Sequence, residues 1–101
     1  MKLIFFVPES HKEKVKKALF KIGAGKIGNY DWCSFEIEGE GQFRPLKEAD
    51  PYIGEIEKLE KVREFKVEMV MNSNLRERAR DVLLKSHPYE TPAYEFYAIL
   101  E

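Results

Sequence analysis

The spacing of apolar residues switches repeatedly between strand and helix periods, and this switching limits the possible folds more than any other feature. Residues 2–7 form a largely apolar run that is too short for a helix and suits a strand buried on both faces. Helical spacing follows over residues 10–22 and returns over residues 75–86. Three further strands are predicted at residues 30–37, 64–71 and 93–100. This βαββαβ order predicts a ferredoxin-like α+β fold, in which a four-stranded antiparallel sheet carries two helices on one face.

Local signals mark the ends of both predicted helices. Ser10 and Glu13 form the Ser-x-x-Glu pattern of a capping box. Gly23 is placed to end the first helix in a left-handed turn. Residues 72–74 are rich in capping side chains, and Pro88 must end the second helix shortly before it.

The segment between the second and third strands is long and irregular. Residues 39–41 (Gly-Glu-Gly) interrupt the second strand, and residues 42–45 can form a short strand beyond a bulge. Residues 46–56 hold scattered charges with a proline and a glycine, which predicts a loop that is functional or mobile. Residues 59–63 fit either a helix or a strand. We therefore expect an extended loop or hairpin between strands two and three.

Length and charge exclude several classes of function. The 101 residues fit one domain, taken as residues 1–101. Seventeen Lys and Arg residues against eighteen Asp and Glu residues leave no basic footprint for nucleic acid. No apolar stretch approaches the roughly 20 residues of a membrane span, and no signal-peptide core is present. Because Cys33 is the one cysteine, no intrachain disulfide is possible. We expect a cytoplasmic protein that binds neither nucleic acid nor membrane.

The predicted strands are apolar on both faces, although two helices can cover only one face of a sheet. In the first strand, Leu3 and Phe5 point one way and Ile4 points the other. The second and last strands carry large apolar side chains on both sides, namely Tyr30, Trp32, Phe35, Ile37, Tyr94, Phe96, Tyr97 and Ile99. An apolar patch of this size usually marks an interface, so we expect other copies of the chain to cover the second face. The alternative is that the segment after residue 39 folds across it.

The densest cluster of chemically versatile residues lies in residues 86–92, which two prolines hold extended. His87 titrates near neutral pH and can bind a metal ion, and Glu90 is close enough in sequence to share a site. A zinc site needs three or four ligands, so His87 and Glu90 alone are too few. Cys33 of another subunit would have to complete a set of His87, Glu90 and Cys33. The structural alternative is that His87 caps the preceding helix while Tyr89 packs at a subunit contact.

Two other patterns have simpler structural interpretations. Residues 23–28 match G-x-G-x-x-G, but a dinucleotide site needs a strand before the motif and a helix after it, and here the order is reversed. That leaves Lys26 as a candidate anion contact only. Tyr30, Trp32 and Cys33 can line a ligand pocket, although packing explains an aromatic cluster with a small buried thiol more simply.

Five motifs together resemble a known family. They are residues 25–30, 33–35, 39–45, 49–54 and 87–94. The set is similar to the domain inserted into bacterial Nif-three-like proteins with a dinuclear metal centre, a domain also found alone as a small protein. The His-Pro-Tyr turn is similar to one in the CutA proteins, which are linked to divalent-cation tolerance. More distantly, the layout resembles the PII signalling proteins.

The resemblance implies a CutA/PII-like domain that assembles as a trimer with its sheets facing inward. It also implies that residues 39–60 correspond to the long loop through which PII proteins contact partners. The flanking halves that supply the dinuclear metal ligands are not in this sequence, so neither that centre nor a hydrolase activity follows from the resemblance.

Two functional hypotheses result. The first is a non-enzymatic, trimeric binding or regulatory module that holds a small ligand, a divalent metal ion or a protein at its subunit clefts. Its candidate ligand-binding residues are His87, Tyr89, Glu90, Asn29, Tyr30 and Arg44. The alternative is a hydrolase-type enzyme with an intersubunit site, in which His87 and Glu90 act as acid and base.

Overall fold

The strands and helices form in the predicted order. The computed structural model describes residues 1–100. Its elements are β1 (Lys2–Pro8), α1 (Glu9–Lys21), β2 (Phe35–Phe43), β3 (Glu60–Val70), the 3₁₀ turn η1 (Ser73–Leu75), α2 (Arg76–Ser86) and β4 (Tyr94–Tyr97). The βαββαβ order expected from the hydrophobic spacing is therefore confirmed.

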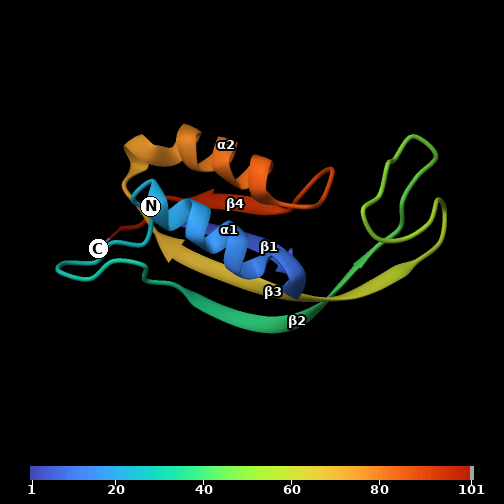
Figure 1. Cartoon of the computed structure of the whole chain (residues 1–101), viewed down its shortest axis with the longest axis horizontal. Coiled ribbons are helices and arrows are strands. Elements are labelled where there is room, and N and C mark those ends of the chain that lie inside the picture. Colours follow the sequence, from blue (N-terminus) through green and yellow to red (C-terminus); the bar gives the residue numbers. More distant parts are fainter. Residues whose placement is uncertain (101) are drawn as a thin grey trace.

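The sheet has four antiparallel strands in the order β2-β3-β1-β4. β1 is central, because it pairs with β3 on one side and with β4 on the other. Both helices lie on one face, and the hairpin of β2 and β3 reaches beyond the end of β1 (Figure 1). This is the predicted ferredoxin-like architecture with an extended hairpin between strands two and three.

The core lies between the helices and the face of the sheet that they cover. β1 and β3 contribute alternate residues to it, as a strand with one buried face requires. These are Leu3, Phe5, Val7, Phe65, Val67 and Met69. The helices contribute buried residues spaced one turn apart: Val15 and Leu19 on α1, and Ala79 and Leu83 on α2. Within residues 1–100, neither helix is both long and apolar enough to cross a membrane.

The second strand begins five residues later than predicted. Tyr30 makes only an isolated bridge with Ile27, and Trp32 has a left-handed backbone (φ 56°), which no regular strand accommodates. The Trp32 ring instead stacks on Phe20 at the end of α1, with 5.3 Å between centroids. The alternation over residues 30–34 thus reflects loop packing, and the prediction that Tyr30 and Trp32 lie on the sheet is wrong.

The prediction that residues 39–41 interrupt the second strand is also wrong. β2 continues through them to Phe43, and its pairing with β3 runs from Phe35↔Glu68 to Phe43↔Glu60. Gly41 has a steric role, because a Cβ at this position would overlap the Glu64 carboxylate that lies across it. The glycine therefore makes room for a side chain of the neighbouring strand.

The helix ends agree only in part with the sequence signals. The prediction of a capping box is wrong, because Pro8 occupies the N-cap of α1 and Ser10 Oγ instead lies 2.9 Å from Nδ1 of His11. Gly23 does end α1 with a left-handed backbone (φ 106°), and its amide donates to the Phe20 carbonyl. Asn72 caps the next helical segment by accepting from the amide of Asn74.

The face of the sheet away from the helices, called the free face, mixes apolar side chains with charge. Its apolar members include Ile4, Phe6, Phe35, Ile37, Val70 and Tyr97. The side chains of Phe35 and Ile37 are 65% and 53% exposed. Lys2 and Glu68 form an ion pair of 3.1 Å between these apolar groups. The segment after residue 39 leaves Phe35 and Ile37 uncovered, so it does not fold across the whole face.

Candidate ligand-binding site

A cavity opens at the end of the sheet where β1 ends and the β2–β3 hairpin continues. It lies between residues 44–59, called the excursion, and residues 87–93, called the turn. Its volume is about 280 Å³, and its lining is mainly aromatic and aliphatic: Phe6, Gln42, Phe43, Pro45, Ala49, Pro51, Tyr52, Ile53, Glu64, Tyr89, Glu90, Thr91 and Ala93. A concave, largely apolar pocket with a few polar groups is the usual form of a small-molecule site.

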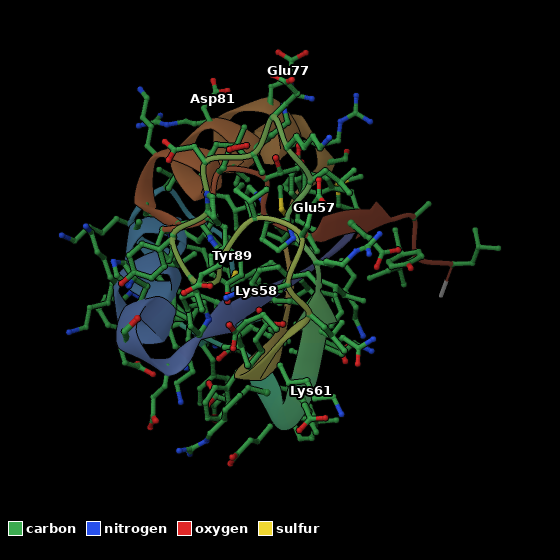
Figure 2. The ribbon with its side chains drawn as sticks, turned by 90° about the vertical axis from the view of Figure 1, so that its right-hand side faces the viewer. Glu57, Lys58, Lys61, Glu77, Asp81 and Tyr89 are labelled. Atoms are coloured by element: carbon green, nitrogen blue, oxygen red, sulfur yellow. The ribbon has the colours of Figure 1, made fainter. Side chains whose placement is uncertain are left out.

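The excursion is fixed in place at three points. The Glu57 amide donates to the Pro45 carbonyl (2.6 Å) and closes its base. The Asp50 amide donates to the Glu90 carboxylate (2.7 Å), which links the crest of the excursion, at Asp50, to the turn. Tyr52 meets His11 of α1 edge to face, with ring centroids 5.7 Å apart. Figure 2 views the molecule from this end, where Tyr89 points inward beneath the excursion.

His87 holds the turn against the sheet. Its Nδ1 accepts from the Tyr89 amide (3.1 Å), so the proton is on Nε2, which donates to the Phe6 carbonyl (2.7 Å). The side chain is 6% exposed, and burial lowers the pKa of His87, although the bond to Phe6 and the charge of Glu64 oppose the shift. His87 is thus neutral, and its ring makes two hydrogen bonds, one within the turn and one to β1. His87 also occupies the C-cap of α2, as the structural alternative supposed, but it does so through its backbone amide, which donates to the Leu83 carbonyl (2.9 Å), and not through its ring.

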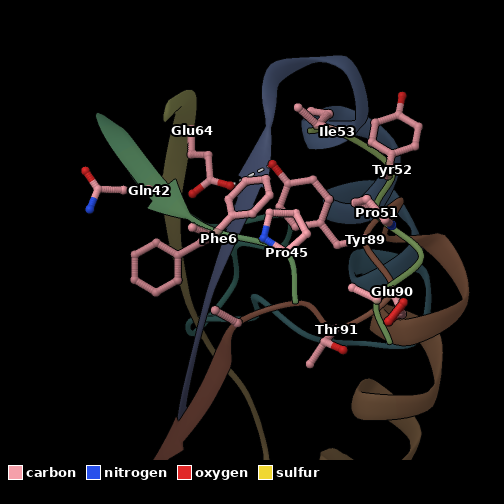
Figure 3. A pocket seen from close by; sticks show the side chains of 13 residues that line it. Phe6, Gln42, Pro45, Pro51, Tyr52, Ile53, Glu64, Tyr89, Glu90 and Thr91 are labelled. Atoms are coloured by element: carbon pink, nitrogen blue, oxygen red, sulfur yellow. Dashed lines mark hydrogen bonds between the residues drawn. The ribbon is translucent and has the colours of Figure 1, made fainter. Parts of the chain in front are cut away.

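Tyr89 connects the turn to the floor of the cavity. Its hydroxyl donates to Glu64 on β3 (2.7 Å), the bond drawn in Figure 3. Burial raises the pKa of Tyr89, and the bond to Glu64 raises it further, so the hydroxyl stays protonated and remains the donor. The Tyr89 ring lies between Phe43 (6.2 Å) and Tyr52 (6.3 Å), measured between centroids.

The predicted ligand-binding residues fall into two groups. Tyr89 and Glu90 line the cavity, while His87 bonds to Tyr89 and Phe6 without lining it. The exposed Arg44 stands between two lining residues and does not line the cavity itself. The other group, Asn29, Tyr30 and Cys33, lies at the opposite end of the long axis, on the loop that precedes β2 (Figure 1).

The predicted metal set is not assembled within one chain. Cys33 lines a separate hollow beside Lys2 and Val70, and His87 has both ring nitrogens engaged. Across residues 1–100, no three His, Cys, Asp or Glu side chains gather closely enough to hold a metal ion.

Of the lining residues only Tyr89 and Glu90 were candidates from the sequence; those it missed include Phe43, Tyr52 and Glu64. Glu64 is an outward position of a charged, alternating strand, and no motif marks it. The one signal for it is indirect, since Gly41 on the paired strand provides the space for its carboxylate.

The buried hydrogen bonds of neutral His87 make the stability of the folded chain depend on pH. Because the pKa of His87 is lowered on folding, the unfolded chain takes up the proton first as pH falls below its ordinary value of about 6.5. The contribution of neutral His87 is therefore complete above that pH, and the melting temperature should fall as the solution is acidified from pH 7 toward the lower folded pKa. His87→Gln should flatten this slope, whereas His11→Gln should retain most of it. Equal slopes in wild type and His87→Gln would contradict the assignment.

The fold defines the class: a ferredoxin-like domain, similar in fold to solved CutA and GlnK structures. The solved CutA of Archaeoglobus fulgidus matches over 99% of this chain and 83% of its own, with a TM-score of 0.71 and 20% identity. GlnK of Bacillus subtilis matches with a TM-score of 0.58 at 18% identity. At these identities the likeness concerns the fold alone.

Relatives with higher identity specify the domain further. The chain is 43% identical over 98 residues to the Bacillus subtilis protein named GTP cyclohydrolase 1 type 2 homolog, covering 97% of this chain and 26% of that one. The solved Bacillus cereus protein related to NIF3 matches with a TM-score of 0.79 and 38% identity, over 93% of this chain and 24% of that one. No family model matches the chain. The chain is thus a homologue of one domain of these NIF3-related proteins and spans about a quarter of the length of the curated relatives it matches.

Proposed function

We propose that the chain is a homo-oligomeric, non-enzymatic binding module that holds a small ligand in the cavity beneath the excursion. The observation that carries this is the cavity itself, an aromatic pocket whose roof is tied down by the Asp50–Glu90 bond. An enzymatic role has less support, because both nitrogens of His87 are already bonded within the chain and neither is free to move a proton to a substrate.

Assembly of several copies is the second part of the proposal. The exposed Phe35 and Ile37 on the free face would lose their contact with water if the faces of several copies met. The CutA-like fold supports a trimer with the sheets facing inward. A metal site of His87, Glu90 and Cys33 would require such an assembly to bring its members together, and elemental analysis of the purified protein tests it.

A protein partner and a cytoplasmic location complete the proposal. Leu46, Ile56 and Leu59 are 63%, 40% and 59% exposed on the excursion, which supports contact with a partner through residues 39–60. The free thiol of Cys33 fits a reducing compartment.

Light scattering at micromolar concentration tests the assembly. Wild type should have about three times the mass of one chain. Ile37→Lys should shift it to a single chain with its circular dichroism unchanged, because the contact would bury a charge whose cross-strand neighbour, Lys66, has the same sign. Leu84→Lys is the matched control: Leu84 is 44% exposed on α2, away from the free face, and this variant should keep the mass of wild type. A wild-type mass equal to one chain would refute the oligomer.

Binding is tested separately with a thermal-shift panel of metabolites, nucleotides and divalent metal ions on wild type and Tyr89→Ala. A ligand that raises the melting temperature of wild type but not of the variant supports the cavity as the site. A panel in which every shift survives in Tyr89→Ala would rule it out.

A further inference from the structure

We propose that the cavity takes a small organic cation, in which an ammonium, guanidinium or quaternary ammonium group is carried on a flat apolar body. This inference rests on the proposed function and specifies its ligand. It follows from three features of the lining: the aromatic rings, the carboxylates, and the absence of any basic side chain among the lining residues.

The rings form a concave wall. Phe43 and Tyr52 are both neighbours of Tyr89 and are tilted to its ring by 53° and 46°, so neither stacks on Tyr89. The His87 ring packs against Tyr89 at 4.9 Å, but Tyr52 is 52% exposed and all three rings line the cavity, so ring surface is available to an apolar body or a cation. A cation within about 6 Å of a ring centroid is attracted by the negative face of the ring, most strongly where water is excluded.

The carboxylates set the sign of the charge that the cavity accepts. Glu64 reaches the floor and is oriented by the Tyr89 hydroxyl on one oxygen, while Gly41 leaves space for the rest of its carboxylate. Glu90 is one of the lining residues (Figure 3) and is oriented by the Asp50 amide, which donates to its carboxylate. Two fixed negative charges attract a cationic ligand and repel phosphates or carboxylates.

Two lysines of the excursion do not reverse this sign, and the exposed Arg44 does not line the cavity. Lys47 pairs with Glu57 and Lys58 pairs with Glu55, both on the exposed surface of the excursion. The two lysines are thus balanced by acids of the same segment. The cavity keeps its own excess of negative charge, since its lining contains Glu64 and Glu90 but no Lys, Arg or His.

A probe series with one ring and three head groups tests the inference by calorimetric titration of the full chain. The probes are 2-phenylethyltrimethylammonium, 2-phenylethanol and 3-phenylpropionate. The cation should bind at least tenfold more tightly than the neutral probe, and the anion should not bind. Glu64→Gln, which retains an acceptor for Tyr89, should lower the affinity for the cation about tenfold and leave that for the neutral probe unchanged. Glu77→Gln on the outer surface of α2 (Figure 2) is the control and should bind like wild type.

The outcomes separate this inference from the proposed function. Equal binding of the cation and the neutral probe, or preference for the anion, would overturn the cation class while the pocket stands. Binding of the cation that is unaffected by Glu64→Gln would also overturn it. If no probe binds, the inference is wrong, and the binding module is then judged by the thermal-shift panel alone.

Discussion

Leu83→Ala should lower the free energy of unfolding by about 2–5 kcal/mol, the range for truncating a buried leucine. Leu83 is fully buried on α2, in the core between the helices and the sheet. The loss has two parts, the apolar surface no longer buried and the cavity that the neighbours cannot fill. Against a typical total stability of about 5–15 kcal/mol, this is a large fraction. Urea unfolding followed by circular dichroism measures it.

The next residue provides the control. Leu84 has the same side chain on the same helix but is 44% exposed. Leu84→Ala should therefore change the free energy of unfolding by less than about 1 kcal/mol, as surface substitutions usually do. Similar losses in the two variants would mean that α2 is not packed on the sheet by the face described.

Gly25→Ala should be the most damaging conservative change outside the core, with a loss of at least about 2 kcal/mol. Gly25 has a left-handed backbone (φ 82°), which costs an alanine about 1–2 kcal/mol. A Cβ here would also lie 2.8 Å from both the Cys33 carbonyl oxygen and the Phe20 ring. Since Gly25 donates to the Val70 carbonyl and accepts from the Cys33 amide, the backbone cannot move aside without breaking these bonds.

Gly28→Ala separates the two costs. Gly28 is also left-handed (φ 57°), but a Cβ there has no neighbour within 4 Å. It should show the backbone cost alone, about 1–2 kcal/mol. Equal losses in the two variants, measured by thermal or urea unfolding, would show that the crowding at Gly25 is relieved by movement.

The fold could be predicted because hydrophobic period and element order are local properties of the chain. The strand boundaries were less accessible. Residues 30–34 alternate in sequence like a strand, but in the fold they form a loop in which Trp32 packs on Phe20 beside a glycine-rich turn. The glycine at 41 looks like a strand breaker, yet it stays paired because Glu64 fills the space above it. Both errors arise because a contact between distant residues overrides the local preference.

The candidate site could be predicted only where it is continuous in sequence. Residues 87–90 stand out because a histidine, a tyrosine and a glutamate lie close together beside two prolines. Phe43, Tyr52 and Glu64 come from a strand end, a loop and the neighbouring strand, and only the topology of the sheet brings them to Tyr89. The topology also separates residues that were predicted to share a site, because it places Cys33 at the far end of the sheet from His87.

The tie between the crest of the excursion and the turn has a consequence for dynamics. The Asp50 amide donates to a side-chain oxygen of Glu90, outside any helix or sheet ladder. Its hydrogen can be replaced by deuterium only when that carboxylate releases it. The exchange rate at this one backbone position thus reports how often the contact between the two segments opens.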